Sequence, residues 1–276
     1  MVVYLNIINI SIITINIASI FHQINKSMGN INKTMTEFLL YIDIIRFLTG
    51  FLILFYASYT DIKTRMAPNI LWIIMGGIGA VLLLIQFIVD GFGDQGLYLI
   101  FIPVMIGLVY LFFQLRLIFG GADAKALMAI ALLTPFQPFQ MLKSYPLYPS
   151  FMPFSWAIFS NSIFLFLFIP LSLCVLNIVK GNIRFPHCFL GYKVTIEKAK
   201  KTFVWPLERF ENETLKLTYV PASFDPSEQI KLFEKKGLKE IWVTPKIPFM
   251  IPLLAGFITA FFFGDILTAI MQFFIT

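Results

Sequence analysis

Hydrophobic residues in this chain fall into long runs, and short polar segments separate the runs. A helix that crosses a membrane needs about 20 mostly apolar residues. Six runs reach or approach that length, and they are Phe38–Tyr59, Ile70–Val89, Leu97–Ile118, Ala124–Thr134, Pro153–Val179 and Ile247–Phe263. The fourth run is too short to cross alone, so we expect it to tilt, to extend past Pro135 or to lie buried. The pattern predicts an all-α polytopic membrane protein with six core transmembrane helices.

A seventh apolar run, Val2–Phe21, leaves two interpretations open. It contains three asparagines and has no Lys or Arg ahead of it. It is therefore a poor secretory signal peptide, which would carry a basic first region. It is either an extra N-terminal transmembrane helix or an extension outside the functional core, and a start at Met35 would omit it.

A polar segment, residues 180–246, interrupts the apolar pattern before the last helix. Asp225 as N-cap and Pro226 in the first turn predict a short helix, and Gly237 predicts its end. β-Branched and aromatic residues predict strands at Lys193–Ala199, Thr202–Phe210, Thr214–Val220 and Glu240–Thr244. We therefore expect a small α+β domain. The predicted parts are a hydrophobic N-terminal extension (1–34), a core of five helices (35–179), a soluble domain (180–246) and the last transmembrane helix (247–276).

The composition agrees with a membrane protein. Hydrophobic residues make up 58% of the chain and charged residues 13%, and the mean hydropathy is +0.83. Soluble domains contain about 25% charged residues. A soluble globule of this size could not cover so much apolar surface. The composition therefore excludes a soluble enzyme and a disordered chain.

The charged residues also predict the orientation of the chain in the membrane. Basic residues in short loops mark the cytoplasmic side. The first loop holds Lys63 and Arg65, and the second holds Asp90 and Asp94 without a basic residue. Residues 180–246 contain 13 of the 21 Lys and Arg residues. We expect the soluble domain in the cytoplasm and the first core helix to start outside. The net charge of +6 then reflects topology and not a nucleic-acid partner.

Two aspartates stand at helix ends on the predicted cytoplasmic side. Asp61 ends the first core helix and Asp123 opens the fourth. Ionisable residues in or beside membrane helices are functional candidates. Two facing carboxylates cannot both ionise easily, so one can act as a base toward water while its protonated partner polarises a carbonyl. Gly120 and Gly121 would let the backbone approach an extended substrate. This pattern indicates the chemistry of an aspartic protease.

Simpler interpretations of these residues stay open. An aspartate at a helix start is most often an N-cap, and Asp61 near Arg65 could belong to an ordinary charge cluster at the membrane surface. Lys125 either orients a substrate or anchors its helix at the interface. Asn69 is expected to cap the second helix.

Two further acidic positions are expected to be structural. Asp43 and Arg46 are spaced as an i, i+3 ion pair and predict a feature of the membrane interface. Asp265 follows Gly264 and is interpreted as an acid at a helix end near the outer face.

The residues around the two aspartates resemble known motifs. Asp61–Asn69 resembles the first aspartate motif of the type IV prepilin peptidases, in which Asp is followed by Arg and then Pro-Asn. Gly120–Asp123 resembles their Gly-x-Gly-Asp motif, with Ala122 in place of the second glycine. The short fourth helix, the insert and Glu240–Pro248 resemble the archaeal preflagellin peptidase branch. The resemblance covers about Met35 to the C-terminus.

This resemblance implies a membrane aspartic endopeptidase that removes class III signal peptides from archaeal preflagellins or type IV prepilins at the cytoplasmic face. Asp61 and Asp123 then form the catalytic pair, without a fixed base or acid role. The residues expected to support the motif and the substrate backbone are Gly120, Gly121, Ala122, Lys125 and Arg65. The expected partners are a precursor and the lipid bilayer, with no nucleic acid, and the oligomeric state stays open.

No cofactor and no metal are expected. The chain has two cysteines, two histidines and no Cys-x-x-Cys pair, which excludes a structural zinc ribbon. His187 and Cys188 are adjacent, which is poor spacing for one metal. The tetracysteine region of bacterial relatives is missing, so the resemblance does not imply N-methylation.

Two other functions are kept as alternatives. One is a presenilin-like protease that cuts other transmembrane substrates, and the other is a proton- or cation-coupled transporter. For the peptidase, acids of the insert are hypothesised to attract the basic segment of the precursor, namely Glu197, Glu208, Glu211 and Glu213.

Overall fold

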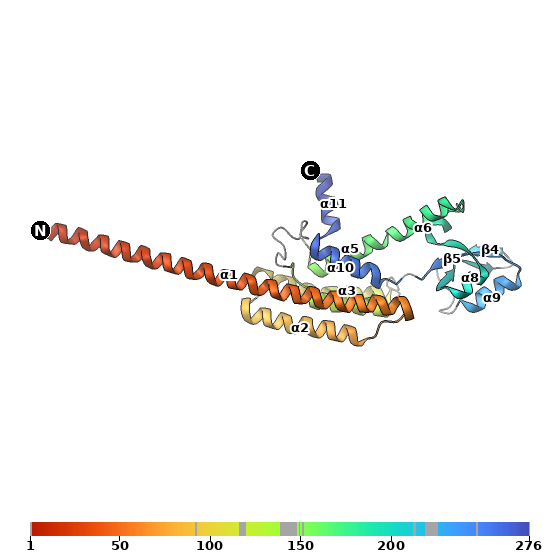
Figure 1. Cartoon of the computed structure of the whole chain (residues 1–276), viewed down its shortest axis with the longest axis horizontal. Helices are drawn as coiled ribbons and strands as arrows, with labels where there is room; N and C mark the ends of the chain where they lie inside the picture. Colours follow the sequence, from red (N-terminus) through yellow and green to blue (C-terminus); the bar gives the residue numbers. More distant parts are fainter. Residues whose placement is uncertain are drawn as a thin grey trace. The chain divides into compact units, whose positions relative to one another are not determined.

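Helices dominate the structure, and one small α+β domain interrupts them (Figure 1). The structure is a computed structural model. It describes residues 2–91, 93–115, 120–138, 148, 150, 152–211, 214–218, 226–246 and 248–275. The chain forms two compact units. The first comprises residues 1–53, 68–157 and 260–276, and the second comprises residues 54–67 and 158–259.

The first helix, α1 (Val2–Thr64), is continuous over 63 residues. It joins the apolar runs Val2–Phe21 and Phe38–Tyr59, which the hydrophobic pattern separates. The first proline of the chain is Pro68, so no proline interrupts the helix before it. A helix of this length measures about 95 Å, roughly three times the hydrocarbon thickness of a bilayer. Its part Lys33–Thr64 is long and apolar enough to cross a membrane.

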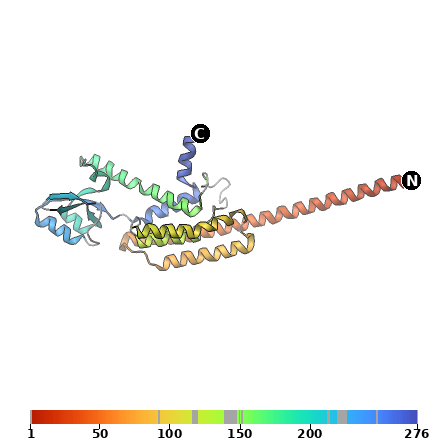
Figure 2. The same ribbon diagram turned by 180° about the vertical axis from the view of Figure 1, so that it is seen from behind.

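Two helices of the first unit pack against its buried helix α4 (Gly121–Leu133). The helix α4 contacts both α2 (Ile70–Asp90) and α3 (Phe101–Gln114), as Figures 1 and 2 show, and the 3-10 helix η1 (Gly93–Ile100) leads into α3. Close contact with α2 requires Gly79, because a Cβ there would lie 2.7 Å from the Cα of Leu133.

The burial of α4 follows from its composition. The helix has 13 residues, six of which are Ala or Gly, and its side chains at Leu127, Ile130 and Leu133 are fully buried. A helix that is buried on almost every side needs small residues so that its neighbours can approach. Of the three outcomes expected for the short fourth run, burial is the one that the structure has.

Four helical segments are long and apolar enough to cross a membrane, and they are Lys33–Thr64, Ile70–Val89, Gly96–Gln114 and Phe154–Val179. They correspond to four of the six predicted core helices. The other two, α4 and α10 (Met250–Phe262), have 13 residues each. The chain is thus a mostly helical membrane protein.

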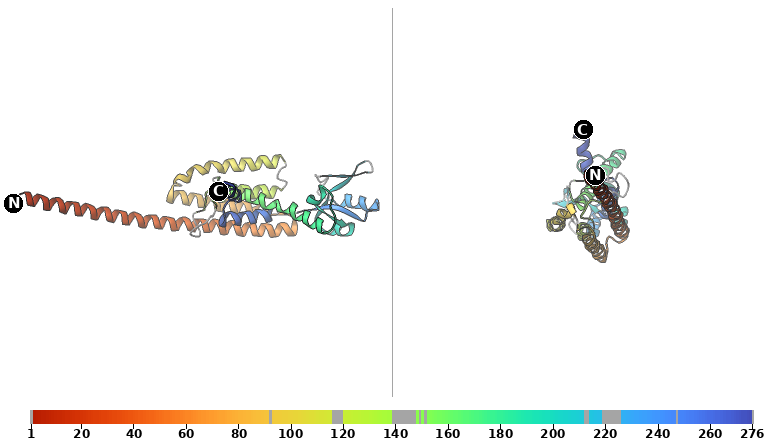
Figure 3. Two further views of the ribbon diagram at one scale, coloured as in Figure 1. Left: turned by 90° about the horizontal axis from the view of Figure 1, so that it is seen from above. Right: turned by 90° about the vertical axis from the view of Figure 1, so that its left-hand side faces the viewer.

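The segment Phe154–Val179 consists of α5 (Phe154–Phe166) and α6 (Phe168–Val179). The two helices separate because Pro170 has no N–H to donate to the carbonyl of Phe166. The helix α6 leads into the α+β domain (Figure 3), and its last turn is hydrogen-bonded to that domain. The fully buried Nδ2 of Asn177 donates to the carbonyls of Cys188, at 2.9 Å, and Gly191, at 2.6 Å.

The α+β domain extends from α7 to β5 and belongs to the second unit. Its three-stranded antiparallel sheet has the order β1-β5-β2, with Tyr192 opposite Val243 and Val204 opposite Pro245, and β3 and β4 form a separate antiparallel pair. Phe233 and Ile241 lie in its core. The elements are α7 (His187–Leu190), β1 (Tyr192–Thr195), α8 (Ile196–Lys201), β2 (Val204–Pro206), β3 (Glu208–Glu211), β4 (Thr214–Leu217), α9 (Ser227–Lys235) and β5 (Glu240–Pro245).

The predicted strands agree with this domain in part. The strand predicted at Glu240–Thr244 is confirmed by β5. The strand predicted at Lys193–Ala199 is wrong beyond Thr195, because the Lys- and Glu-rich sequence that follows forms α8. The run Thr202–Phe210 is divided into β2 and β3 at Leu207. The run Thr214–Val220 is a strand as far as Leu217, and residues 219–220 lie outside the described part of the chain.

The short helix of this domain, α9, ends where the sequence predicts. Gly237 has a φ of 75° and donates its N–H to the carbonyl of Glu234, while Leu238 donates to Phe233. These two bonds form a Schellman motif, which favours glycine at the left-handed position. The predicted N-cap, Asp225, lies outside the described residues, and Pro226 occupies the N-cap position of α9.

The segment predicted as the last transmembrane helix, 247–276, contains two short helices, α10 and α11 (Ile266–Ile275). They separate at Gly264, which has a φ of 88°. Asp265 then caps α11, because its carboxylate accepts hydrogen bonds from the N–H of Leu267 at 3.1 Å and the hydroxyl of Thr268 at 2.8 Å. The interpretation of Asp265 as a helix-end acid is confirmed.

Candidate active site

Asp61 lies in the last turn of α1, three residues before its end. Its backbone carbonyl accepts a hydrogen bond of 3.0 Å from the N–H of Arg65. Arg65 has a φ of 56°, the left-handed conformation that usually holds Gly or Asn after a helix. Arg65 therefore ends the helix that carries Asp61, which is a structural role that its charge alone does not indicate.

Asp123 is the third residue of α4. Its carboxylate lies near the positive end of the helix dipole, where negative charge is favoured. The preceding Gly120 has an extended backbone with φ −90° and ψ 115°, so its conformation does not require glycine. The requirement is steric, because a Cβ at Gly120 would collide with the carboxylate Oδ2 of Asp123 and lie 2.8 Å from its Cγ.

The two residues between Gly120 and Asp123 are less constrained. A Cβ at Gly121 would lie 3.8 Å from the ring of Phe113, which is ordinary van der Waals contact. Ala122, which stands where the family motif has its second glycine, is partly buried in the first turn of α4. The space beside the Asp123 carboxylate is thus provided by Gly120.

Lys125 contacts the end of the first motif, which lies in the same unit as Lys125. Its Nζ donates a hydrogen bond of 2.9 Å to Oδ1 of Asn69, the last residue of the Asp61–Asn69 motif. Asn69 occupies the predicted N-cap position of α2, but its side chain makes no cap hydrogen bond there. Its amide oxygen faces Lys125 instead. The sequence contained no signal for this pairing, since 56 residues separate the partners.

The two aspartates belong to different compact units, Asp61 to the second and Asp123 to the first. The residues predicted to support the motif divide in the same way. Arg65 lies in the second unit with Asp61, whereas Gly120 and Lys125 lie in the first with Asp123.

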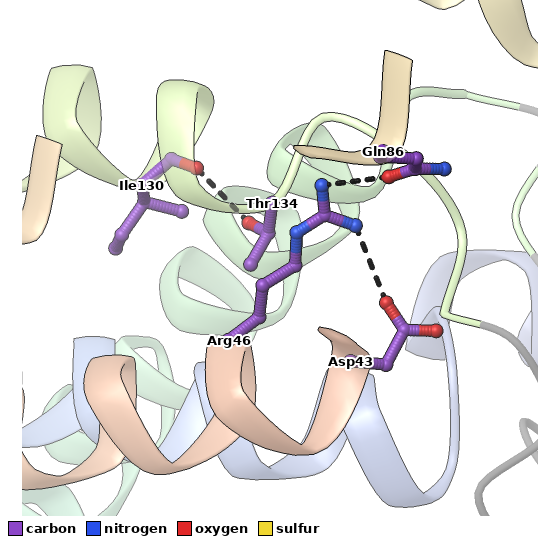
Figure 4. Close-up of polar contacts among 5 residues, drawn as sticks. All are labelled: Asp43, Arg46, Gln86, Ile130 and Thr134. Atoms are coloured by element: carbon purple, nitrogen blue, oxygen red, sulfur yellow. Dashed lines mark hydrogen bonds and ion pairs between the residues drawn. The ribbon is translucent and has the colours of Figure 1, made fainter. Parts of the chain in front are cut away.

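The predicted pair of Asp43 and Arg46 forms a buried polar cluster in the first unit (Figure 4). Nη1 of Arg46 lies 3.3 Å from Oδ1 of Asp43, and Nη2 donates to Oε1 of Gln86 at 2.9 Å. The guanidinium also lies over the ring of Phe136, with 5.7 Å between Cζ and the ring centroid. Asp43 is 5% exposed and Arg46 3%. The pairing is confirmed, and both side chains are buried, with Arg46 reaching Gln86 of α2. The expected location of the pair at the membrane interface stays a prediction.

The acids expected to attract a precursor differ in their accessibility. Glu197 is exposed. Glu208 is 3% exposed, and its Oε1 accepts a hydrogen bond of 2.8 Å from Nη1 of Arg184. The hypothesis is therefore wrong for Glu208, because its charge is already compensated inside the α+β domain. The side chain of Glu211 and the whole of Glu213 lie outside the described residues.

The same interior holds His187, which is 3% exposed and lies 3.5 Å from Oε1 of Glu208 through its Nε2. Burial lowers the pKa of His187 below its usual value, Arg184 lowers it further, and Glu208 acts in the opposite direction. Among the described residues, no three His, Cys, Asp or Glu side chains gather closely enough to hold a metal ion.

Comparison with known proteins identifies the family. A family model described as the type IV leader peptidase family matches residues 48–179, and one described as the archaeal peptidase A24 C-terminus, type II, matches residues 184–266. A preflagellin peptidase of Methanococcus voltae is 30% identical over 241 residues, which cover 82% of this chain and 98% of that protein. The chain belongs to the preflagellin peptidase family.

Two further preflagellin peptidases support this membership. The protein of Methanococcus maripaludis is 28% identical and that of Methanocaldococcus jannaschii is 28% identical, and each alignment covers 80% of this chain. The alignments cover 96% and 94% of those two proteins. The chain is accordingly a membrane protease, and the resemblance that its aspartate motifs indicate is confirmed.

Proposed function

We propose that this protease is an aspartic endopeptidase that removes the class III signal peptide from preflagellin or type IV prepilin precursors at the cytoplasmic membrane face. Asp61 and Asp123 form its catalytic pair. One carboxylate, ionised, takes a proton from water, and the other, protonated, donates a hydrogen bond to the scissile carbonyl. The substrate assignment rests on the relatives, which are preflagellin peptidases.

One observation carries this assignment. The segment matched to the type IV leader peptidase family, 48–179, contains four acidic residues in the sequence, Asp61, Asp90, Asp94 and Asp123. The chain passes through α2 between Asp61 and Asp90, and through α3 between Asp94 and Asp123. Two membrane crossings would return the chain to the side on which it began, which supports pairing Asp61 with Asp123 rather than with Asp90 or Asp94.

We further propose six membrane crossings, with α4 and α10 contributing to the core together with the four longer segments. The parts of the chain are then an N-terminal extension (1–34), the core (35–179), the cytoplasmic domain (180–246) and the last transmembrane segment (247–276). The basic residues concentrated in 180–246 support its cytoplasmic location. Protease digestion of inverted membrane vesicles tests this, because a cytoplasmic domain is cut in inverted vesicles and protected in intact cells.

The test of the proposed chemistry is cleavage of a precursor flagellin by variants of the full chain. Asp61→Asn and Asp123→Asn should each abolish cleavage, whereas the matched change Asp90→Asn, at the end of α2, should retain it. Cleavage by either of the first two variants would exclude the proposed pair. Mapping the cut site decides between two proteases, because a cut ahead of the hydrophobic segment indicates signal peptide removal and a cut within it indicates presenilin-like proteolysis.

A further inference from the structure

The last turns of α1 are held from both sides of Asp61 by residues of the second unit. One turn before Asp61, the buried hydroxyl of Ser58 donates a hydrogen bond of 3.0 Å to the carbonyl of Met250, the first residue of α10. One turn after Asp61, the guanidinium of Arg65 lies over the ring of Phe203, with 5.1 Å between Cζ and the ring centroid. Residues i−3 and i+4 of the aspartate are therefore both fixed by contacts outside α1.

Phe203 is held firmly enough to act as a platform. It directly precedes β2, and its carbonyl accepts a hydrogen bond of 3.0 Å from the N–H of Lys246. The next pair in the sheet is Val204 opposite Pro245. Phe203 is 55% exposed and does not belong to the core cluster of the α+β domain. Packing of the domain therefore does not explain an aromatic residue at this position, whereas the contact with Arg65 does.

Arg65 depends on this ring. Its Nε and Nη1 are buried, and in the described part of the chain neither has a hydrogen-bond partner. A guanidinium that lacks such partners gains from stacking on an aromatic face. Arg65 also occupies a left-handed conformation that costs energy for any residue with a Cβ. The stacked ring compensates for both features and keeps the end of α1 in one conformation.

Both contacts lead to the same place in the chain. The backbone carbonyl of Phe203 accepts a hydrogen bond from the N–H of Lys246, and Met250 follows Lys246 by four residues. The segment that follows β5 is thus connected to α1 through Phe203, whose ring contacts Arg65. The start of α10 is connected to α1 through the hydrogen bond from Ser58 to Met250. The α+β domain holds the helix end that carries Asp61.

We propose that the α+β domain positions Asp61 for catalysis and that Phe203 is the positioning residue through which it does so. This inference rests on the proposed function, in which Asp61 is catalytic. Without the aromatic ring, Arg65 leaves its left-handed conformation and the last turn of α1 frays, so the Asp61 carboxylate loses its fixed direction. A displacement of about 1 Å in a reacting group can cost about 100-fold in rate.

The experiment compares Phe203→Leu, which removes the π face, with Phe203→Tyr, which keeps it, in the full chain. We expect the leucine variant to lower kcat for precursor cleavage about tenfold or more, with KM within about twofold, and the tyrosine variant to restore kcat. The matched control is Trp205→Leu, which removes a second cation–π pair of the same domain, with Lys246 at 4.6 Å. Its kcat should stay near that of the parent protein.

Hydrogen exchange provides a measurement that does not depend on activity. The N–H of Arg65 is bonded to Asp61, so Phe203→Leu should accelerate its exchange, while the amides of β5 stay protected if the domain is folded. An unchanged kcat in Phe203→Leu, with or without faster exchange, would overturn the positioning role. If Asp61→Asn is inactive in that case, the catalytic pair stands and only this inference fails. If Asp61→Asn cleaves normally, the proposed function itself fails.

Discussion

Lys125 donates a hydrogen bond of 2.9 Å from its Nζ to Oδ1 of Asn69, which links the N-terminal part of α4 to the start of α2. Lys125 follows Asp123 by two residues, and Asn69 ends the motif that begins with Asp61. Asn69 occupies the N-cap position of α2, but its side chain serves as the acceptor for Lys125 and not as a cap. The contact also gives Lys125 a structural role, the link between α4 and α2.

Loss of this hydrogen bond should weaken catalysis without abolishing it. We expect Asn69→Leu to lower kcat/KM for precursor cleavage about threefold to tenfold, since a hydrogen bond to a charged group contributes modestly when solvent can compete. Asn69→Asp keeps an oxygen acceptor opposite Lys125 and should retain activity. Initial cleavage rates of the purified variants measure the effect, and equal rates for the leucine and aspartate variants would contradict it.

Gly120 should be far less tolerant of substitution than its neighbour Gly121. A Cβ at Gly120 collides with the Asp123 carboxylate, whereas a Cβ at Gly121 makes an ordinary contact with Phe113. We expect Gly120→Ala to reduce kcat about 100-fold, because the carboxylate must move, and Gly121→Ala to remain within about threefold of the parent. Both variants add one methyl group at the start of the same helix, so they control for each other. Equal kcat values in the two variants would refute the steric explanation.

The buried cluster of Asp43, Arg46 and Gln86 should contribute to stability and not directly to chemistry. Its member Asp43 lies 18 residues before Asp61 on α1, which corresponds to about 27 Å along the helix. Arg46→Met should lower the free energy of unfolding by about 3–5 kcal/mol, because it removes one partner of a buried ion pair. Gln86→Leu should cost about 1–3 kcal/mol. Unfolding in detergent micelles measures both changes.

A double substitution tests whether the loss of stability in Arg46→Met comes from the unpaired charge that Asp43 then carries. Asp43→Leu combined with Arg46→Met removes both charges, so it should be less destabilising than Arg46→Met alone. If the double variant loses as much free energy of unfolding as the two single variants lose together, the two side chains do not interact as described.

Much of the fold could be predicted because its determinants are local. The apolar runs indicated the helices, and Gly237 and Asp265 indicated helix ends that the structure contains. The motif around Asp123 indicated the family. These signals depend on neighbouring residues, and so a single sequence displays them.

The contacts that were missed join residues far apart in the chain. Lys125 and Asn69 are separated by 56 residues, and Arg46 and Gln86 by 40. Nothing in the sequence near Glu208 indicates that Arg184, 24 residues away, compensates its charge. The hydrophobic pattern also does not predict that α1 is continuous. It shows where apolar residues recur, but it does not show whether the polar stretch between two apolar runs is helical.

His187 should make the α+β domain less stable in mild acid. Its pKa is lowered in the folded protein by burial and by Arg184, whereas the unfolded chain binds a proton near pH 6.5. Above that pH both states are neutral at this residue and it contributes nothing to the pH dependence. As the pH falls below about 6.5, the unfolded state binds a proton at His187 that the folded state does not bind, so the free energy of unfolding decreases. Hydrogen exchange of the β5 amides in the intact protein at pH 7.5 and 5.5, corrected for intrinsic rates, measures the loss.

The control for this prediction is the second histidine of the chain, His22. His187→Leu should remove most of the acid-dependent loss of protection in β5, because the residue pairs with Trp242 of that strand at a ring distance of 5.4 Å. His22→Leu should leave the loss unchanged. Glu208 limits the size of the effect, because a protonated His187 can form an ion pair with its carboxylate at 3.5 Å. A His187→Leu protein that loses protection in acid as the parent does would show that other groups titrate instead.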